Sequence, residues 1–137
     1  MDIASIRQAL VNAVKSTPGI RTVYEFPTLE VAREWPAVAL RPLEVRVDRV
    51  ARGLSTAEWR WEVWLGMPVD QKTSEAAWRV AQETVDALIE RLASWTELGE
   101  GLTVAAVTSA GFGFVNRDVG PVVEARVVVT VRVPVAV

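Results

Sequence analysis

The strongest constraint on the fold lies in the C-terminal segment, residues 122–137. From Val123 to Val135 every odd-numbered position is apolar, whereas charges such as Glu124 and Arg126 stand at even positions. A period of two is that of a β-strand, and the charges exclude a membrane-spanning helix. A long valine-rich strand left at a sheet edge would invite aggregation. We therefore expect this strand to lie inside a sheet or to pair with a neighbouring subunit.

The composition removes most reactive chemistry, because the 137 residues include no histidine and no cysteine. Imidazole bases, thiolate nucleophiles, disulfides and the usual zinc and haem ligands are therefore excluded. The net charge of −2 offers no basic field for nucleic acid. A chain of this length suits one domain with its own core. We expect a single domain over residues 1–137 that is not an enzyme and has no catalytic residue, metal or cofactor.

Two segments have the 3.6-residue period of amphipathic helices. The first starts near Ile3, is stopped by the sequence Thr17-Pro18-Gly19, and has an apolar stripe formed by Ile3, Ile6, Leu10, Ala13 and Val14. The second can be capped by Asp70, Thr73 or Ser74. Its predicted buried stripe consists of Ala77, Trp78, Ala81, Val85, Leu88, Leu92 and Trp95.

Segments 43–47 and 59–65 alternate between apolar and charged residues, which predicts two strands. The alternation changes parity at Pro42, where we expect a bulge. The polar segment 49–57 predicts a long hairpin loop between these strands. A register that sets Asp48 opposite Arg60 avoids like-charge pairs, and opposite-charge pairs contribute about 0.2–1 kcal/mol each. This register also sets Arg46 opposite Glu62.

The remaining segments complete an α+β pattern. Residues 20–26 suit a short strand or extended link, and strand-like residues 102–114 reverse direction near 116–121 before the final strand. The order is helix, strands, helix, strands. This order predicts a mainly antiparallel sheet with two helices packed on one face and long hairpin loops.

Two motifs that could carry chemistry have simpler structural explanations. The acids Glu44, Asp48, Glu58 and Glu62 alternate with arginines, which favours cross-strand ion pairs over a catalytic carboxylate pair. The stretch 111–114 contains G-x-G, but no third glycine follows and no helix begins after it. A phosphate-binding loop needs both, so we assign these glycines to relief of crowding in a strand.

The candidate functional residues are therefore contact residues. Trp64 and Val128 interrupt otherwise polar strand faces, so each is covered either by its own chain or by a partner, and both possibilities stay open. The loop 49–56 is either a solvated tip or a contact with another subunit. The interface candidates are Arg49, Arg52, Leu54, Trp64, Asn116, Arg117, Asp118 and Val128.

Beyond these patterns, nearly the whole chain resembles the small tail terminator proteins of long-tailed bacteriophages. The N-terminal helix, with its sequence Ile3-Ala4-Ser5-Ile6-Arg7-Gln8-Ala9-Leu10, is followed by Pro18-Gly19-Ile20-Arg21-Thr22-Val23-Tyr24, similar to the start of that family. The stretches 52–59 and 63–66 resemble its central hairpin. Residues 108–115 and 124–133 resemble its last hairpin. The likeness is one of element order, and related small neck and connector proteins share it.

The resemblance implies a ring, usually of six subunits, that caps the tail tube and ends its polymerisation. Its partners would be the major tail tube protein and the head–tail connector or neck proteins, with DNA passing through the ring without sequence-specific binding. The location would be the tail or neck of a virion assembled in the cytoplasm of a bacterial host. A head-completion or neck protein is the nearest alternative. A small enzyme using Glu and Arg, or a ligand-binding module, is a more distant one.

Overall fold

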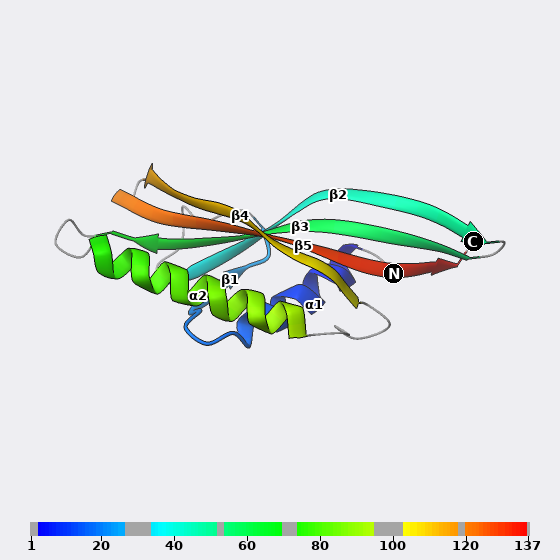
Figure 1. Cartoon of the computed structure of the whole chain (residues 1–137), viewed down its shortest axis with the longest axis horizontal. Helices are drawn as coiled ribbons and strands as arrows, with labels where there is room; N and C mark the ends of the chain where they lie inside the picture. The colour runs from blue at the N-terminus through cyan, green and yellow to red at the C-terminus, as the bar shows by residue number, and fades with distance from the viewer. Residues whose placement is uncertain are drawn as a thin grey trace.

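The computed structural model describes residues 3–26, 34–51, 54–69, 74–94, 103–117 and 120–136. In chain order these form α1 (Ile3–Lys15), β1 (Thr22–Tyr24), β2 (Ala37–Ala51), β3 (Leu54–Pro68), α2 (Ser74–Ser94), β4 (Thr103–Arg117) and β5 (Gly120–Ala136). The strands make one sheet in the order β1-β2-β3-β5-β4 (Figure 1). The predicted α+β class is confirmed.

The sheet is antiparallel except at one end, where the short β1 runs parallel to β2. β5 lies between β3 and β4, so the valine-rich final strand is inside the sheet. Of the two alternatives that the sequence left open, a place inside the sheet or pairing with a neighbouring subunit, the first is therefore correct. The edges belong to β4 on one side and, beyond the three residues paired with β1, to β2 on the other.

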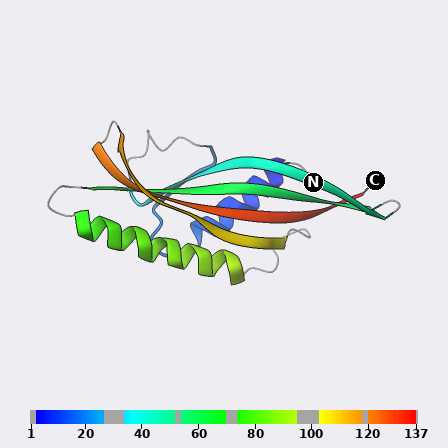
Figure 2. The same cartoon turned by 45° about the horizontal axis from the view of Figure 1, so that its top comes forward.

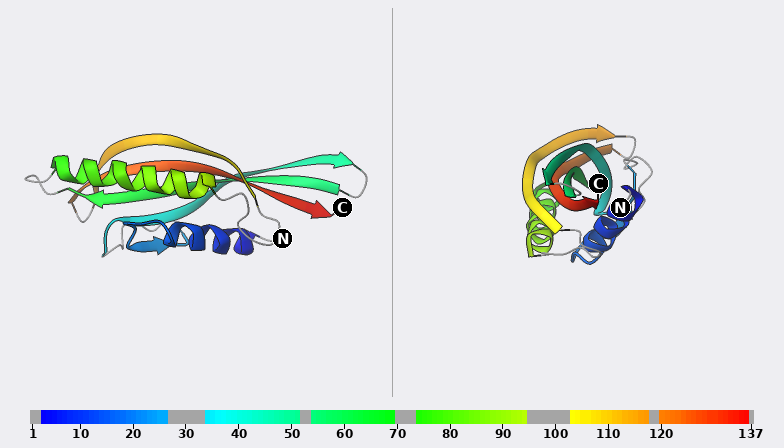
Figure 3. Two further views of the ribbon diagram at one scale, coloured as in Figure 1. Left: turned by 60° about the horizontal axis from the view of Figure 1, so that its bottom comes forward. Right: turned by 90° about the vertical axis from the view of Figure 1, so that its right-hand side faces the viewer.

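Both helices cover the same face of the sheet, here called the helix face, as predicted (Figures 1 and 3). α1 buries the expected stripe plus Val11, with Ile3 partly buried. α2 buries Ala77, Ala81, Val85, Leu88 and Leu92, whereas Trp78, which was expected in the buried stripe, is only partly buried. These side chains pack on the odd-numbered residues of β5 from Val123 to Val133, all of which are buried. The apolar residues that recur every 3.6 positions in the helices thus pack against those that recur every two positions in the strands, and together they form one core. Trp95, Asp70 and Thr73 lie outside the described residues.

β2, β3 and β5 end together in a twisted three-stranded arm, whose tip continues past the end of both helices (Figure 2). The arm comprises residues 43–51, 54–61 and 129–136, which are paired except for Leu43 and Val50 at two register shifts. Its base, at Trp61 and Val129, packs in the core with the helices, and only its tip lies beyond them. Seen end-on, the whole sheet is strongly curved (Figure 3). The expected long hairpin loop over 49–57 is wrong, because strand pairing continues to Ala51 and resumes at Leu54. Likewise β4 runs to Arg117 and β5 begins at Gly120, so this hairpin is also tight.

The predicted register of β2 on β3 is also wrong. Asp48 lies opposite Thr56, not Arg60, while Arg46 faces Glu58 and Glu44 faces Arg60. The strands are slipped by four residues from the expected register, which still keeps each face intact because four is an even number. Opposite charges do face each other, but in a third register that the sequence analysis did not consider. The expected irregularity at Pro42 is confirmed by a register shift between Pro42 and Glu44.

Candidate interaction surface

The face of the sheet away from the helices, here called the outer face, carries a ladder of ion pairs. Arg60 lies 2.7 Å from Glu44, Arg132 lies 2.8 Å from Glu58, and Arg41 lies 3.1 Å from Glu62. Each pair joins residues directly opposite each other on neighbouring strands. This arrangement confirms the cross-strand interpretation of Glu44, Glu58 and Glu62. Among the described residues, no three acidic side chains gather to form a possible metal site.

Trp64 stands beside this ladder and is half-buried against its own chain. Its ring packs near Ala37 and Ala39, together with Tyr24 and Trp35. The indole Nε1 donates a hydrogen bond to Glu124, and the Arg126 guanidinium lies over the ring at 5.6 Å. Contacts within the chain therefore cover much of Trp64, while part of the ring stays accessible.

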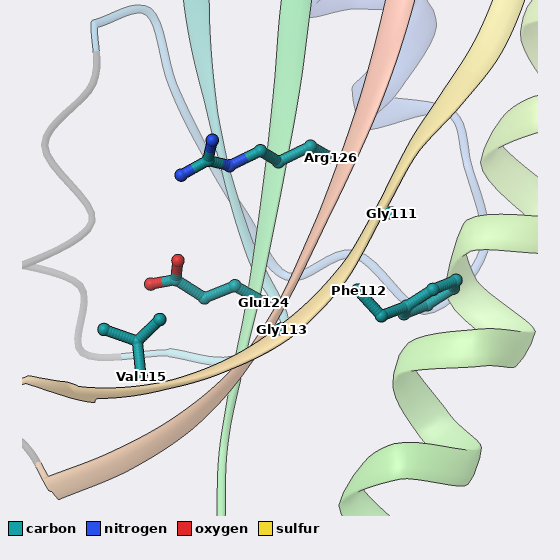
Figure 4. Close-up of a pocket in the computed structure, with 6 residues that line it drawn as sticks. All are labelled: Gly111, Phe112, Gly113, Val115, Glu124 and Arg126. Atoms are coloured by element: carbon teal, nitrogen blue, oxygen red, sulfur yellow. The ribbon is translucent and has the colours of Figure 1, made fainter.

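A hollow of about 210 Å³ opens on the outer face next to Trp64, here called the glycine hollow (Figure 4). Its lining residues are Gly111, Phe112, Gly113, Val115, Glu124 and Arg126. Figure 4 shows the side chains of Val115, Glu124 and Arg126 on one side of the sheet, and Phe112 directed to the opposite side, toward α2. Because the two glycines carry no side chain, bare backbone forms the floor.

The geometry of β4 explains these glycines. Gly111 has a φ of +118°, which L side chains rarely adopt, and it follows a register shift between Ser109 and Gly111. At both Gly111 and Gly113 an added Cβ would meet no atom within 4 Å. The glycines thus shape a bulged edge strand, as their sequence context predicted, and leave open space above it.

Exposed apolar side chains gather at the two sheet edges. Of the seven large hydrophobic side chains that are exposed in the described part of the chain, six lie on β2 or β4: Leu43, Val45, Val47, Phe112, Phe114 and Val115. Val45 and Val47 are paired with Trp59 and Ala57, so they lie on the helix face of the arm, yet they are exposed. Phe112 and Phe114 lie on the helix face of β4, and Phe112 contacts Trp78 with ring centroids 6.5 Å apart. Large exposed apolar patches commonly mark interaction sites.

A half-buried arginine of α1 packs against the sheet. The Cζ atom of Arg7 lies 4.7 Å from the ring centroid of Phe26 and 5.7 Å from that of Trp61. Such cation–π contacts contribute about 0.5–1 kcal/mol at exposed sites and more when desolvated. Arg7 Nε and Trp61 Nε1 are both buried without a hydrogen-bond partner. This contact belongs to the core and joins a helix to the centre of β3.

The predicted contact residues lie in three parts of the sheet: the arm, the connected ends of β4 and β5, and the outer face around Trp64 and Val128. Arg49 and Leu54 belong to the paired strands of the arm, opposite Ser55 and Ala51, and not to a loop. Asn116 is exposed on β4 opposite Pro121, and Arg117 pairs with Gly120. Val128 is half-buried between Glu62 and Thr108. Arg52 and Asp118 lie outside the described residues, and the contact role of all eight residues stays a prediction.

Sequence reasoning missed most of the edge patch. Alternation correctly placed Leu43, Val45 and Val47 in a strand, but it could not show that the helices end before them. Phe112 and Phe114 were considered only as neighbours of glycines. Strand order, which the sequence did not determine, is what puts both groups at edges.

None of the helices among the described residues is both long enough and apolar enough to cross a membrane. When the chain is compared with known protein families and with curated proteins, no family model and no curated sequence matches it.

Proposed function

We propose that this protein is a structural subunit of tail terminator type. Copies of it would form a ring, of six subunits in the resembled family, that caps the tail tube of a long-tailed bacteriophage and joins the tail to the head connector. Its working parts would be surfaces that bind other proteins. The tail or neck of the virion would be its location, and it would be assembled in the host cytoplasm.

The observation that carries the proposal is the position of the exposed hydrophobic side chains. They lie on the two strands that bound the sheet, one group on a projecting arm and the other beside α2. Side chains placed in this way suit a subunit that is covered by protein on two sides. A ring needs two different, mutually complementary surfaces on every subunit, because its contacts are heterologous.

The sequence resemblance supports the same proposal. The expected order of helix, strands, helix and strands is the order of the elements in the structure. Three of the four acids that were the alternative basis for an enzyme, Glu44, Glu58 and Glu62, are held in ion pairs with arginines at 2.7–3.1 Å. Paired carboxylates of this kind stabilise a sheet face, so they lend the enzyme alternative no support.

The direct test is co-assembly with a tail tube protein. The chain is expressed with the major tail tube protein encoded nearest its own gene, and tube lengths and ends are measured by electron microscopy. We expect shorter tubes, each with a ring at one end. Unchanged lengths with bare ends, or a gene that has no tail genes beside it, would contradict the proposal. Rings that bind the head connector but no tube would favour a neck protein instead.

A further inference from the structure

We propose that the arm of one copy docks along the β4 edge of a second copy, with Val45 and Val47 beside Phe114 and Phe112, and Arg46 over the glycine hollow. The inference takes from the proposed function only the assumption that the partner is another copy of this chain. It names the two surfaces that meet and their register.

The two edges have compatible directions. β2 is antiparallel to β3, β3 to β5, and β5 to β4, so β2 and β4 run in opposite directions within one copy. Two copies that lie side by side in the same orientation therefore present an antiparallel pair of edge strands. Beyond Ala39, no described strand occupies the β2 edge. Edge strands present backbone N–H and C=O groups that can form hydrogen bonds with the edge strand of another chain.

One register matches the apolar side chains of both strands. When Val45 stands opposite Phe114 of the second copy, Val47 stands opposite Phe112. All four side chains are exposed, with fractions between 43% and 62%, and all four lie on the helix face. Contact between these pairs would cover the exposed valines of the arm and the exposed phenylalanines of β4 at the same time. An arm-to-arm contact would leave Phe112 and Phe114 in water.

The same register produces charge complementarity on the outer face. It sets Arg46 opposite Gly113, which is paired within its own chain with Glu124. It also sets Asp48 opposite Gly111, which is paired with Arg126. The side chain of Arg46 would thus approach a carboxylate that lines the hollow. The glycines leave the space that such approaches need, because nothing lies within 4 Å of a Cβ at either position.

The net charges of the arm and of α2 also favour a second copy of this chain as the partner. The described residues near the end of the arm, 45–51 and 54, contain two arginines and one aspartate, whereas α2, which contacts Phe112 through Trp78, contains four acids and two arginines. Opposite net charges steer two surfaces together. The two copies would be displaced along the strand direction. Within one copy, Val45 lies level with residue 59 of β3, whereas Phe114 lies level with residue 67 of the same strand. Eight residues correspond to about 26 Å, and repetition of one such contact closes a ring or extends a filament.

The natural absence of cysteine makes disulfide trapping the decisive test. Two single-cysteine proteins, Val45→Cys and Phe114→Cys, are mixed under mild oxidation and the cross-linked species are resolved by mass. Opposite residues on antiparallel strands have Cβ atoms within reach of a disulfide. A mixture of Val45→Cys with Gln8→Cys, on the exposed side of α1, is the matched control. We expect the Val45–Phe114 disulfide to form at least ten times faster than the control disulfide.

Two other outcomes would overturn the inference. If Val45→Cys links to itself as fast as to Phe114→Cys, the arms pair with each other. If all combinations react equally slowly, the two edges do not meet. A second variant, Gly113→Val, fills the hollow without touching the core and is expected to weaken self-association at least tenfold by light scattering, with an unchanged circular dichroism spectrum. Unchanged association of this variant would exclude Arg46 from the hollow.

The test separates this contact from the proposed function. Wild-type protein that caps tail tubes while Val45 and Phe114 fail to cross-link would refute the contact and leave the function intact. Rapid cross-linking in a protein that has no effect on tubes would support the contact and refute the tail terminator assignment.

Discussion

Trp64 Nε1 donates a hydrogen bond of 2.9 Å to Glu124 Oε2, diagonally across the β3–β5 pair on the outer face. Glu124 is only 4% exposed, so its carboxylate is buried where it needs partners. The indole provides one such partner and at the same time packs beside Ala37 and Ala39. A tryptophan on a charged strand face is therefore explained first by its own chain.

This bond predicts the effect of Trp64→Phe. Phenylalanine keeps most of the packing but leaves the buried Glu124 without its indole donor, so we expect the free energy of unfolding to fall by about 1–3 kcal/mol. Urea denaturation measures the loss. The double variant Trp64→Phe/Glu124→Leu removes both partners and should lose less than the sum of the two single changes. Additive losses would show that the bond contributes nothing.

The comparison of sequence with structure shows what alternation can and cannot determine. Which face each residue occupies was predictable for α1, α2, β3 and β5, because periods of 3.6 and two depend only on local geometry. The bulge at Pro42 was predictable because it changes the parity of the alternation. Candidate contact residues were harder, since Val45 and Val47 look like core residues until the length of the neighbouring helices is known.

The β2–β3 register shows the limit most clearly. Sliding β2 by two or four residues keeps its apolar side on the helix face, so the pattern alone allows several registers. Cross-strand charges narrowed the choice, but Arg46 finds an acid opposite both in the expected register and in the observed one. The observed register is the one in which pairing extends to Ala51 and resumes at Leu54, and the polar sequence of this segment did not indicate that the strands extend so far.

The ion-pair ladder predicts different costs for two similar substitutions. Glu62 has a side chain only 7% exposed and is paired with Arg41, whereas Arg60 and Glu44 are both about half exposed. Arg41→Met should therefore lower the free energy of unfolding by about 1–2 kcal/mol, because it leaves a buried carboxylate without its cation. Arg60→Met should cost less than about 1 kcal/mol.

Salt provides the control for this pair of variants. The small effect of Arg60→Met should disappear in 1 M NaCl, where the screening length is about 3 Å, while most of the Arg41→Met effect should remain. Equal losses with equal salt dependence would contradict the different burial of Glu44 and Glu62.

The helix–sheet core predicts a large loss at one leucine of α2. Leu88 is fully buried against the sheet, so Leu88→Ala should lower the free energy of unfolding by about 2–5 kcal/mol through lost burial and the cavity left behind. Val45→Ala, at a side chain 45% exposed on the arm, should cost no more than about 0.5 kcal/mol in the monomer. Thermal or urea unfolding at a protein concentration that keeps the chain monomeric measures both. A comparable loss at Val45 would mean that the arm is packed within its own subunit.

The bulge in β4 provides a test in which only the backbone differs. Gly111 has a φ of +118°, whereas Gly113 has an ordinary strand conformation, and a Cβ at either position would meet open space. Gly111→Ala should therefore destabilise the protein by about 1–3 kcal/mol from backbone strain alone. Gly113→Ala should be neutral or slightly stabilising, because alanine restricts the unfolded chain more than glycine does. Circular dichroism melts of the two variants give the comparison, and equal melting temperatures would show that β4 can relax its bulge at no cost.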